Sequence, residues 1–543
     1  MEMTGAQILV EGLLREGVEQ MFGYAGATIC PAVDALMAHP EIGYTLVRTE
    51  QNAGHMASGY TRVSGKPGVC MVTSGPGATN LITGIATAYM DSIPMVAITG
   101  QVPSNLLGRD IFQEVDITGA VSAFSKHCYL VKDAAQLPRI IKEAFHIAST
   151  GRPGPVLIDI PIDVQQQVVK DVSFPDHVSI RGYNPSVRGN EKQIQNVAAA
   201  IARAERPVIC AGGGVFLSHA EQALAEFARR TAIPVVTTMM GLSLLPTDHP
   251  LNMGMIGAHG NASANKTLAR ADLLIMIGTR AADRAILSPE EIQRRMPSVH
   301  IDVDPAEIGK NMRSTYPLVG DVQAILNQLL EAGVHANCAP WLAQRQVCRQ
   351  EELQRDYPVR AGSIFPGRLL RLLGQKMAPD AAVCVDVGQN QIWACKHLWL
   401  HGQRFMTSGG LGTMGYALPA AVGVKTAQPD RQTVVICGDG SFQMAMNELS
   451  AVKAHGLDIK IVLFRNGVLG LVHQIQSSAP YHGPFGVALD GNPDFAAIAA
   501  AYGVSCITVQ EEDQVEPALE QFLSAPGSCL LIADVDPSVT TND

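Results

Sequence analysis

The chain has 543 residues, a formal net charge of −10 and 47% hydrophobic residues, and at roughly 150 residues per domain its length predicts about three domains. The acidic balance without a basic run makes nucleic acid and anionic membranes poor partners. No apolar stretch approaches the roughly 20 residues that span a bilayer. The first residues lack the basic and apolar regions of a signal peptide, and the eleven scattered cysteines contain no CxxC pair. We therefore expect a cytoplasmic protein with buried thiols rather than disulfides or zinc ligands.

The first predicted domain, residues 1–165, alternates short apolar runs with helical patterns. We expect strands at 44–47, 69–72, 95–98 and 156–160, and a helix at 80–89. Glu50 follows the first of these strands and opens another helix. A lone carboxylate there is most often only a favourable charge at a helix N-terminus.

The second predicted domain, residues 190–334, follows a polar, proline-containing linker at 174–190. Its strands are expected at 207–210, 273–277 and 299–303. The run Gly212–Gly214 after the first strand is weak evidence for a dinucleotide site because it lacks the GxGxxG spacing. A second polar stretch, 344–359, predicts a helix-rich linker.

The third predicted domain, residues 362–543, carries two buried strands at 434–437 and 459–464, with a helix at 442–454 between them. Alternating strands and helices throughout predict an α/β fold with three doubly wound parallel-sheet domains. No sequence repeat is visible, although a topology shared by the first and last domains stays open.

Two oxygen-bearing side chains lie at the ends of the strands of the third domain. Asp439 follows the first strand within Gly438-Asp439-Gly440-Ser441, and Asn466 follows the second. Ligands of doubly wound sheets bind at these carboxyl ends. Mg²⁺ held by a few protein oxygens completes its shell with water and a diphosphate, and glycines let the backbone approach that diphosphate. The spacing therefore predicts a site for Mg²⁺ and a diphosphate cofactor.

This spacing resembles the signature of enzymes that use thiamine diphosphate (ThDP, or thiamine pyrophosphate), in which GDG precedes an asparagine. With Glu50, the whole chain resembles the large catalytic subunit of acetolactate (acetohydroxyacid) synthase over nearly its full length. The matching blocks are 73–80, 91–94, 100–103, 112–116, 125–127, 152–156 and 407–415. The family implies ThDP-binding folds around a central Rossmann-like domain. It also implies decarboxylation of pyruvate and transfer of the hydroxyethyl unit to a second 2-oxo acid, in branched-chain amino acid biosynthesis.

The resemblance implies roles for the matched residues. Glu50 would activate the cofactor through its pyrimidine ring, and Met414 would hold the cofactor bent. The cofactor contacts implied are Glu50, Gly77, Asn80, Asn390, Gln391, Gly412, Thr413, Met414, Gly440, Ser441 and Leu469, and the Mg²⁺ ligands are Asp439, Asn466 and the carbonyl of Val468. The residues facing the substrate would be Phe112, Gln113, Lys126 and Arg284. The alternatives are core packing for Met414, a buried ring for Phe112 and a solvated charge for Lys126.

The family also implies a second cofactor and an oligomer. FAD would occupy the central domain at Gly213, His259, Gly278, Arg280, Asp302 and Asp321. Because the Glu50 site of one subunit and the Asp439 site of its partner would meet, the resemblance implies a homodimer, with a tetramer and a small regulatory subunit as further possibilities.

Several residues depart from the family pattern. Ala27, Ala258, Arg465 and Ile475 differ from the usual residues, and the chain stops at Asp543 where the family continues into a tail. These departures leave the cofactor chemistry in place and leave the acceptor open. The alternatives are a pyruvate-only or other-acceptor carboligase, a related 2-oxo acid decarboxylase or pyruvate oxidase, and a non-catalytic paralogue.

Overall fold

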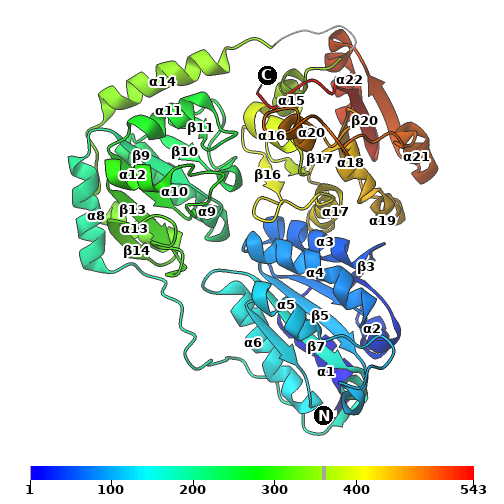
Figure 1. Ribbon diagram of the computed structural model, residues 1–543. Coiled ribbons are helices and arrows are strands. Elements are labelled where there is room, and N and C mark those ends of the chain that lie inside the picture. The colour runs from blue at the N-terminus through cyan, green and yellow to red at the C-terminus, as the bar shows by residue number, and fades with distance from the viewer. Residues whose placement is uncertain (1, 358–362, 543) are drawn as a thin grey trace.

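Three six-stranded sheets, parallel in every strand pair, succeed one another along the chain (Figure 1). The computed structural model describes residues 2–357 and 363–542. Apolar, β-branched runs form the strands, and helices cover both faces of each sheet, as expected for strands buried on both sides. The predicted fold class, α/β with three doubly wound sheets, is confirmed. A small antiparallel pair, β1 (Met3–Thr4) with β8 (Val168–Val169), closes the first unit.

The first sheet has the order β3-β2-β4-β5-β7-β6. Its strands are β2 (Gln20–Tyr24), β3 (Gly43–Leu46), β4 (Gly68–Val72), β5 (Met95–Gln101), β6 (His127–Leu130) and β7 (Pro155–Pro161). Its helices are α1 (Gly5–Arg15), α2 (Cys30–Met37), α3 (Glu50–Ser64), α4 (Pro76–Met90), α5 (Ile117–Val121), α6 (Leu137–Ser149) and α7 (Ile162–Gln166). The four strands predicted from sequence in this unit are confirmed.

The second sheet has the Rossmann order, β11-β10-β9-β12-β13-β14. Its strands are β9 (Pro207–Ala211), β10 (Val235–Thr237), β11 (Asn252–Met255), β12 (Leu273–Ile277), β13 (Ser298–Asp302) and β14 (Tyr316–Val319). Its helices are α8 (Glu191–Arg203), α9 (Gly214–Leu217), α10 (Glu221–Thr231), α11 (Ala262–Arg270), α12 (Pro289–Arg295) and α13 (Val322–Glu331), followed by α14 (Ala339–Leu353) in the second predicted linker. Residues 358 and 359 of that linker, and Gly362 at the predicted start of the third domain, lie outside the described residues.

The third sheet has the order β16-β15-β17-β18-β20-β19. Its strands are β15 (Ala382–Val385), β16 (Arg404–Thr407), β17 (Thr433–Gly438), β18 (Lys460–Arg465), β19 (Ser505–Val509) and β20 (Cys529–Asp534). Its helices are α15 (Pro366–Lys376), α16 (Gln389–His397), α17 (Ala417–Ala427), α18 (Asp439–Gln443), α19 (Leu449–Ala454), α20 (Gly470–Gln476), α21 (Phe495–Tyr502) and α22 (Val515–Ser524). Counted in chain order, the first and third sheets have one strand order, so they share a topology without a visible sequence repeat.

The helix predicted at 442–454 is not continuous, so that prediction is wrong. The stretch 442–454 divides into α18, a 3₁₀ turn (Met446–Glu448) and α19, because Ala445 adopts φ −134° and ψ 1° and ends the run of helical hydrogen bonds. The break turns Glu448 toward the first domain, where backbone and side-chain donors face it.

Helices α3 and α17 bring the first and third domains together (Figure 1). Glycines let the two backbones approach: a Cβ on Gly59 would lie 2.0 Å from the carbonyl oxygen of Ala420, and one on Gly423 would lie 1.9 Å from that of Met56. On its other side α3 meets α4, where Gly54 faces Gly84. Helix α3 is therefore buried between two helices, which holds its first residue, Glu50, in place.

Three further observations concern the first linker, the cysteines and the length of the helices. The stretch between β8 and α8 contains no helix or strand among its residues, all of which the structure describes. All eleven cysteines are free. Among the described helices, none is both long and apolar enough to cross a membrane.

Candidate active site

Glu50 is the first residue of α3 and lies in the first domain with the start of α4. Its carboxylate is buried, with 9% of the residue exposed, and accepts a hydrogen bond from Asn80 Nδ2 at 2.9 Å. A Cβ on Gly77 would lie 3.2 Å from Glu50 Oε1, so a side chain at position 77 would crowd this face of the carboxylate. Glu50, Gly77 and Asn80 are thus neighbours in the structure.

The loop that carries Phe112 and Gln113 lies against the same end of α4. Gln113 has a positive φ of 60°, and a Cβ on Gly75 would lie 2.8 Å from the Cβ of Gln113. Phe112 beside it is 87% exposed. The alternative of a buried ring for Phe112 is therefore wrong, and an exposed ring next to Gln113 suits contact with a ligand or a second chain.

Ala27, one of the departures from the family pattern, lies in the same neighbourhood. The hydroxyl of the next residue, Thr28, bonds that of Thr73 at 2.9 Å and accepts from the N–H of Ser74 at 3.0 Å. A Cβ on Gly77 would lie 2.6 Å from Thr73 Cγ2. The turn at Ala27 therefore lies close to Gly77 and Glu50.

The second group of predicted residues lies at the carboxyl ends of β17 and β18, and Asp439 is its central carboxylate. Its Oδ2 accepts hydrogen bonds from the N–H of Gly467 at 2.7 Å and from Asn492 Nδ2 at 2.9 Å, and its Oδ1 accepts from the N–H of Gly440 at 3.0 Å. Burial raises the pKa of Asp439, and these donors oppose the shift. A buried carboxylate at the C-terminal edge of a parallel sheet is suited to a cation.

Asn466 lies near Asp439 at the end of β18, and two hydrogen-bond partners determine the orientation of its amide. Asn466 Nδ2 donates to Gln389 Oε1 at 3.2 Å, and its Oδ1 accepts from the N–H of Val468 at 3.2 Å. Gln389 is in turn held by Gln474 Oε1 and by the carbonyl of Val539, both at 3.1 Å. The oxygens of Asp439, Asn466 and Val468 are hard donors of the kind Mg²⁺ takes.

Apolar side chains cover Gly440. A Cβ there would lie 2.9 Å from Leu469, 3.4 Å from Leu489 and 3.6 Å from Met414 Cε. Met414 thus projects over the turn that the sequence assigns to the diphosphate, beside Leu469. Its role as the wedge that bends the cofactor stays a prediction.

The loop before α17 carries Met414, and hydrogen bonds to Asp386, at the end of β15, hold this loop in place. Asp386 accepts from the N–H of Gly415 at 2.9 Å and of Ala417 at 3.0 Å, and burial raises its pKa to about 6. Thr413 Oγ1 bonds Thr87 Oγ1 of the first domain at 2.8 Å. The other predicted cofactor residues of this group also lie around this loop and α16: Gly412 with φ 75°, Asn390 donating to the carbonyl of Asp386, Gln391 donating to Thr407, and Ser441 bonded to Gly438.

The predicted residues thus form two half-sites in one chain. The hydrogen-bond partner of Glu50 is in the first domain, and the partners of Asp439 are in the third. A cofactor that contacts both Glu50 and Asp439 would therefore have to bind between the two half-sites, and the hydrogen bonds within either half do not show how they meet.

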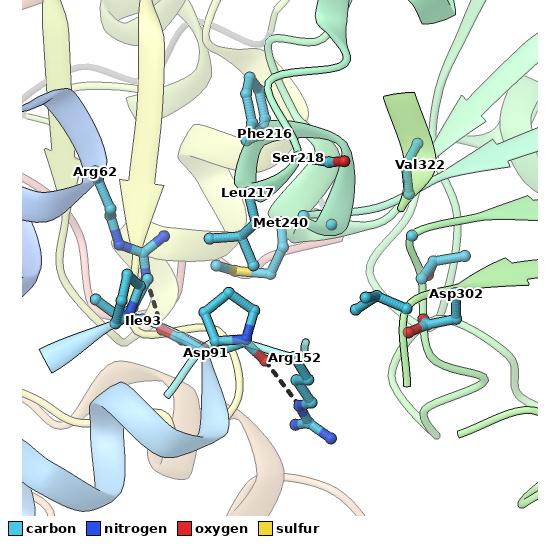
Figure 2. A pocket seen from close by; sticks show the side chains of 18 of the residues that line it. Arg62, Asp91, Ile93, Arg152, Phe216, Leu217, Ser218, Met240, Asp302 and Val322 are labelled. Atoms are coloured by element: carbon cyan, nitrogen blue, oxygen red, sulfur yellow. Dashed lines mark hydrogen bonds and ion pairs between the residues drawn. The ribbon is translucent and has the colours of Figure 1, made fainter. Parts of the chain in front are cut away.

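A cavity of about 1000 Å³ lies at the C-terminal edge of the second sheet, where the three domains meet. It is lined by every residue predicted for FAD and by Arg284: Gly213, His259, Gly278, Arg280, Arg284, Asp302 and Asp321. Figure 2 shows Leu217 and Met240 on one side of this cavity, Asp302 on another, and the ion pair of Arg62 with Asp91 at its border. The position is the ligand crevice of a Rossmann sheet.

Neighbouring groups of the protein interact with several of the ionisable side chains that line this cavity. Arg280 donates to the carbonyl of Met90 at 2.9 Å. Burial raises the pKa of Asp302 to about 6; the hydrogen bond from the Asp304 N–H opposes the shift, and the charges of Asp304 and Glu307 add to it. Burial lowers the pKa of His259, as do the charges of Arg284 and Lys396.

Lys126 occupies a different position from the other predicted substrate residues. Its ammonium donates to the carbonyl of Ile147, to that of Thr150 at 2.7 Å and to the hydroxyl of Tyr183 at 2.9 Å. Burial lowers the pKa of Lys126 to about 8. The alternative of a solvated charge is therefore wrong, and the structure groups Lys126 with the linker and with α6 rather than with Gln113. Its contact with substrate stays a prediction.

The other departures differ in their surroundings. Arg465 forms a two-bond ion pair with Asp534, Nε to Oδ1 at 2.6 Å and Nη2 to Oδ2 at 2.8 Å, across neighbouring strands. That pairing is a structural reason for arginine before Asn466. Ile475 is 50% exposed on α20, and Ala258 is exposed and donates its N–H to the carbonyl of Arg284 at 3.2 Å. Both remain free to contact a ligand.

Sequence reasoning missed five residues that hold the two half-sites: Asp386, Gln389, Glu448, Leu489 and Asn492. Gln389 adjoins the predicted Asn390 and could have been found from that position. The others lie in no motif, and their partners are far away in the sequence, so no local signal marks them.

Comparisons with known proteins agree with this arrangement. Three family profiles match: Thiamine pyrophosphate enzyme, N-terminal TPP binding domain, over residues 3–120; central domain, over 194–329; and C-terminal TPP binding domain, over 386–533. An acetolactate synthase of Arthrospira platensis is 42% identical and covers 97% of this chain and 93% of its own length. The acetolactate synthase large subunit of Corynebacterium glutamicum is 41% identical, over 96% of this chain and 84% of its own. A probable acetolactate synthase large subunit of Methanocaldococcus jannaschii is 40% identical, over 99% and 92%.

Proposed function

Since the chain belongs to the thiamine pyrophosphate enzymes and, among them, to the acetolactate synthases, we propose that it decarboxylates pyruvate and joins the hydroxyethyl unit to a second 2-oxo acid at a site built from its two half-sites. The observation that carries the proposal is that one chain holds both features: a buried glutamate at a helix start, Glu50, and the Asp439 and Asn466 oxygens at the ends of two adjacent strands.

Bound thiamine diphosphate would supply an acidic carbon and an electron sink for the loss of CO₂. Glu50 would hold a proton at the pyrimidine ring, with Asn80 Nδ2 orienting its carboxylate. Asp439, Asn466 and the Val468 carbonyl would hold Mg²⁺, and Gly440 and Ser441 the diphosphate. Met414 and Leu469, which lie over Gly440, would exclude water from that end of the site.

The two half-sites support a homodimer in which Glu50 of one subunit serves the Asp439 site of its partner. The hydrogen-bond partners of each carboxylate come from its own domain, so neither carboxylate is hydrogen-bonded to the other half-site of the same chain. The exposed ring of Phe112 and the half-exposed Ile475 suit such a contact. By analogy with relatives named as large subunits, a small regulatory subunit is part of the proposal.

FAD is proposed for the cavity of the second domain. The volume of about 1000 Å³ is at the upper end for ligand sites and leaves room for a dinucleotide. Asp302 lines the cavity with a carboxylate that can accept from hydroxyl groups, Asp321 lines it with a carboxylate that also accepts from Ser218 and the Ala324 N–H, and Arg284 offers a guanidinium to the carboxylate of a 2-oxo acid.

The test supplies purified protein with thiamine diphosphate, Mg²⁺ and pyruvate, with and without 2-oxobutanoate. We expect 2-acetolactate from pyruvate alone, and 2-aceto-2-hydroxybutyrate to appear with the second acid. Acetaldehyde or acetyl phosphate in place of acetolactate would contradict the proposal and favour a related decarboxylase or oxidase. Flavin absorbance of the purified protein, and its loss when the cavity is narrowed by Gly213→Leu, tests FAD separately.

A further inference from the structure

Glu448 is a buried carboxylate of the third domain that contacts the helix start carrying Glu50. The residue is 0% exposed. Its Oε1 accepts hydrogen bonds from the backbone N–H of Arg48 and from Asn52 Nδ2, both at 2.8 Å. Arg48 and Asn52 lie two residues before and two residues after Glu50. One oxygen of the third domain therefore holds both flanks of the predicted activating residue.

The start of α3 needs such a partner. Thr49 is its N-cap residue, with φ −151° and ψ 143°, but its side chain makes no capping hydrogen bond. The first N–H groups of a helix have no partner within it, and a negative charge near that end is stabilising. Glu448 places a carboxylate beside this helix end from another domain, and it accepts from the N–H of Arg48, just before the N-cap, and from the Asn52 side chain in the first turn.

The other oxygen of Glu448 is unusual for a buried carboxylate. Among the described residues, Oε2 has no hydrogen-bond partner. Burial raises the pKa of Glu448, while Asn52 and the Arg48 backbone N–H oppose the shift. Burying a carboxylate with one oxygen unpaired is unfavourable for folding alone, so the arrangement points to a positional role for this group.

We propose that Glu448 is a positioning residue for Glu50: it fixes the first turn of α3 so that the Glu50 carboxylate stays aligned for proton transfer with the cofactor. This inference rests on the proposed function, because it uses the role given there to Glu50. Glu448 also ends the segment that begins with Asp439. It therefore ties the metal-binding segment of a chain to the activating helix of the same chain.

The first measurement is hydrogen–deuterium exchange of the cofactor-free protein, which does not depend on activity. We expect Glu448→Ala to speed exchange of the backbone amides of residues 48–54 by about tenfold or more, because the first turn of α3 opens more often. Glu448→Gln keeps an acceptor for both donors and should retain most of the protection. Glu512→Ala is the matched control: Glu512 is also buried in the third domain and accepts from the backbone N–H of Phe365, away from α3.

The second measurement is the exchange of the C2 proton of bound thiamine diphosphate with solvent deuterium, followed by NMR after acid quench. We expect Glu448→Ala to slow it by about 10- to 100-fold, the effect of a small misplacement of a reacting group, while the thiamine diphosphate concentration for half-saturation stays within about twofold of the wild type. Glu448→Gln should stay within about threefold of the wild-type rate, and Glu512→Ala should match the wild type.

Glu50→Gln serves as the reference that separates the two proposals. If Glu50→Gln leaves the C2 exchange unchanged, the proposed function of Glu50 is wrong. If Glu50→Gln slows the exchange but Glu448→Ala does not, the positioning role is overturned and the function stands. Should Glu448→Ala fail to fold, Asn52→Ala removes one of the two donors; it should slow C2 exchange, and a wild-type rate in that variant would also overturn the positioning role.

Discussion

Asp386, Asp439 and Glu448 are buried carboxylates of one domain that differ in what faces them. Backbone N–H groups of the Met414 loop face Asp386, donors from the β18 turn face Asp439, and the first domain faces Glu448. Burial raises the pKa of all three, and in each case hydrogen bonds oppose the shift. The environment, rather than the residue type, therefore assigns each carboxylate its task.

The raised pKa of Asp386 predicts a pH dependence of stability. Its pKa of about 6 in the folded state exceeds the ordinary value of 3.8, so between these values the folded state binds more protons than the unfolded state. Stability from this group is therefore present at low pH and is lost as the pH rises to about 6. The free energy of unfolding of Asp386→Asn, relative to that of the wild type, should therefore rise by about 1–3 kcal/mol from pH 4 to pH 7. Denaturant unfolding at each pH measures this difference. If this relative free energy of unfolding fell from pH 4 to pH 7 instead, the hydrogen bonds from the backbone N–H groups would lower the pKa of Asp386 by more than burial raises it.

Glu50→Gln should reduce turnover of pyruvate by about 10²- to 10⁴-fold, because an amide does not exchange a proton with the cofactor at neutral pH. The thermal midpoint should change little, since glutamine can still accept from Asn80 Nδ2. The matched control is Glu11→Gln, a partly exposed glutamate of the same domain paired with Arg15; its activity should equal that of the wild type. Equal activities of the two variants would contradict the role of Glu50.

At the scale of elements, small residues decide how α3 packs. Gly54 meets Gly84 of α4, while Gly59 and Gly423 bring α3 and α17 into backbone contact. A helix buried on two sides holds its first residue firmly, whereas the Phe112 and Gln113 loop beside it is partly exposed. Firm placement of Glu50 and the accessibility of the loop predicted to face the substrate thus come from different elements.

Gly423→Ala should destabilise the protein by about 1–3 kcal/mol, although alanine is the better helix former in isolation. The new Cβ would lie 1.9 Å from the carbonyl oxygen of Met56, so the two helices must separate. Gly12→Ala is the matched control: in α1 the new Cβ would meet the end of the Ile141 side chain, which can move. Denaturant unfolding should show a smaller loss for Gly12→Ala, and equal losses would contradict the backbone contact.

At the scale of the whole molecule, the two half-sites predict that a chain defective in one half can be rescued by a chain defective in the other. Co-expression of Glu50→Gln and Asp439→Asn chains, each with its own tag, gives hybrids that keep one intact site if the site lies between subunits. We expect a purified hybrid dimer to have about half the wild-type activity per dimer. Each homodimer should be nearly inactive. A hybrid no more active than the homodimers would place both carboxylates in the site of one chain.

Elements and turns near the strand ends could be predicted from the sequence because their signals are local. The β-branched runs before Asp439 and Asn466 mark adjacent strands, and the carboxyl ends of parallel strands meet at one edge. The break at Ala445 could not be predicted in this way, because the partners that draw Glu448 inward belong to another domain. The pairing of Arg465 with Asp534 likewise depends on the register of β18 against β20.

The sequence by itself determined the α/β fold class, nine of the strands, the family and the oxygen donors at Asp439 and Asn466, because periodicity and turn chemistry act over a few residues. Only the tertiary structure decided the shared strand order of the first and third sheets, the cavity where three domains meet, and the contacts of Asn492, Asp386 and Glu448. Those contacts join residues far apart in the chain, so they exist only after the helices and sheets have packed.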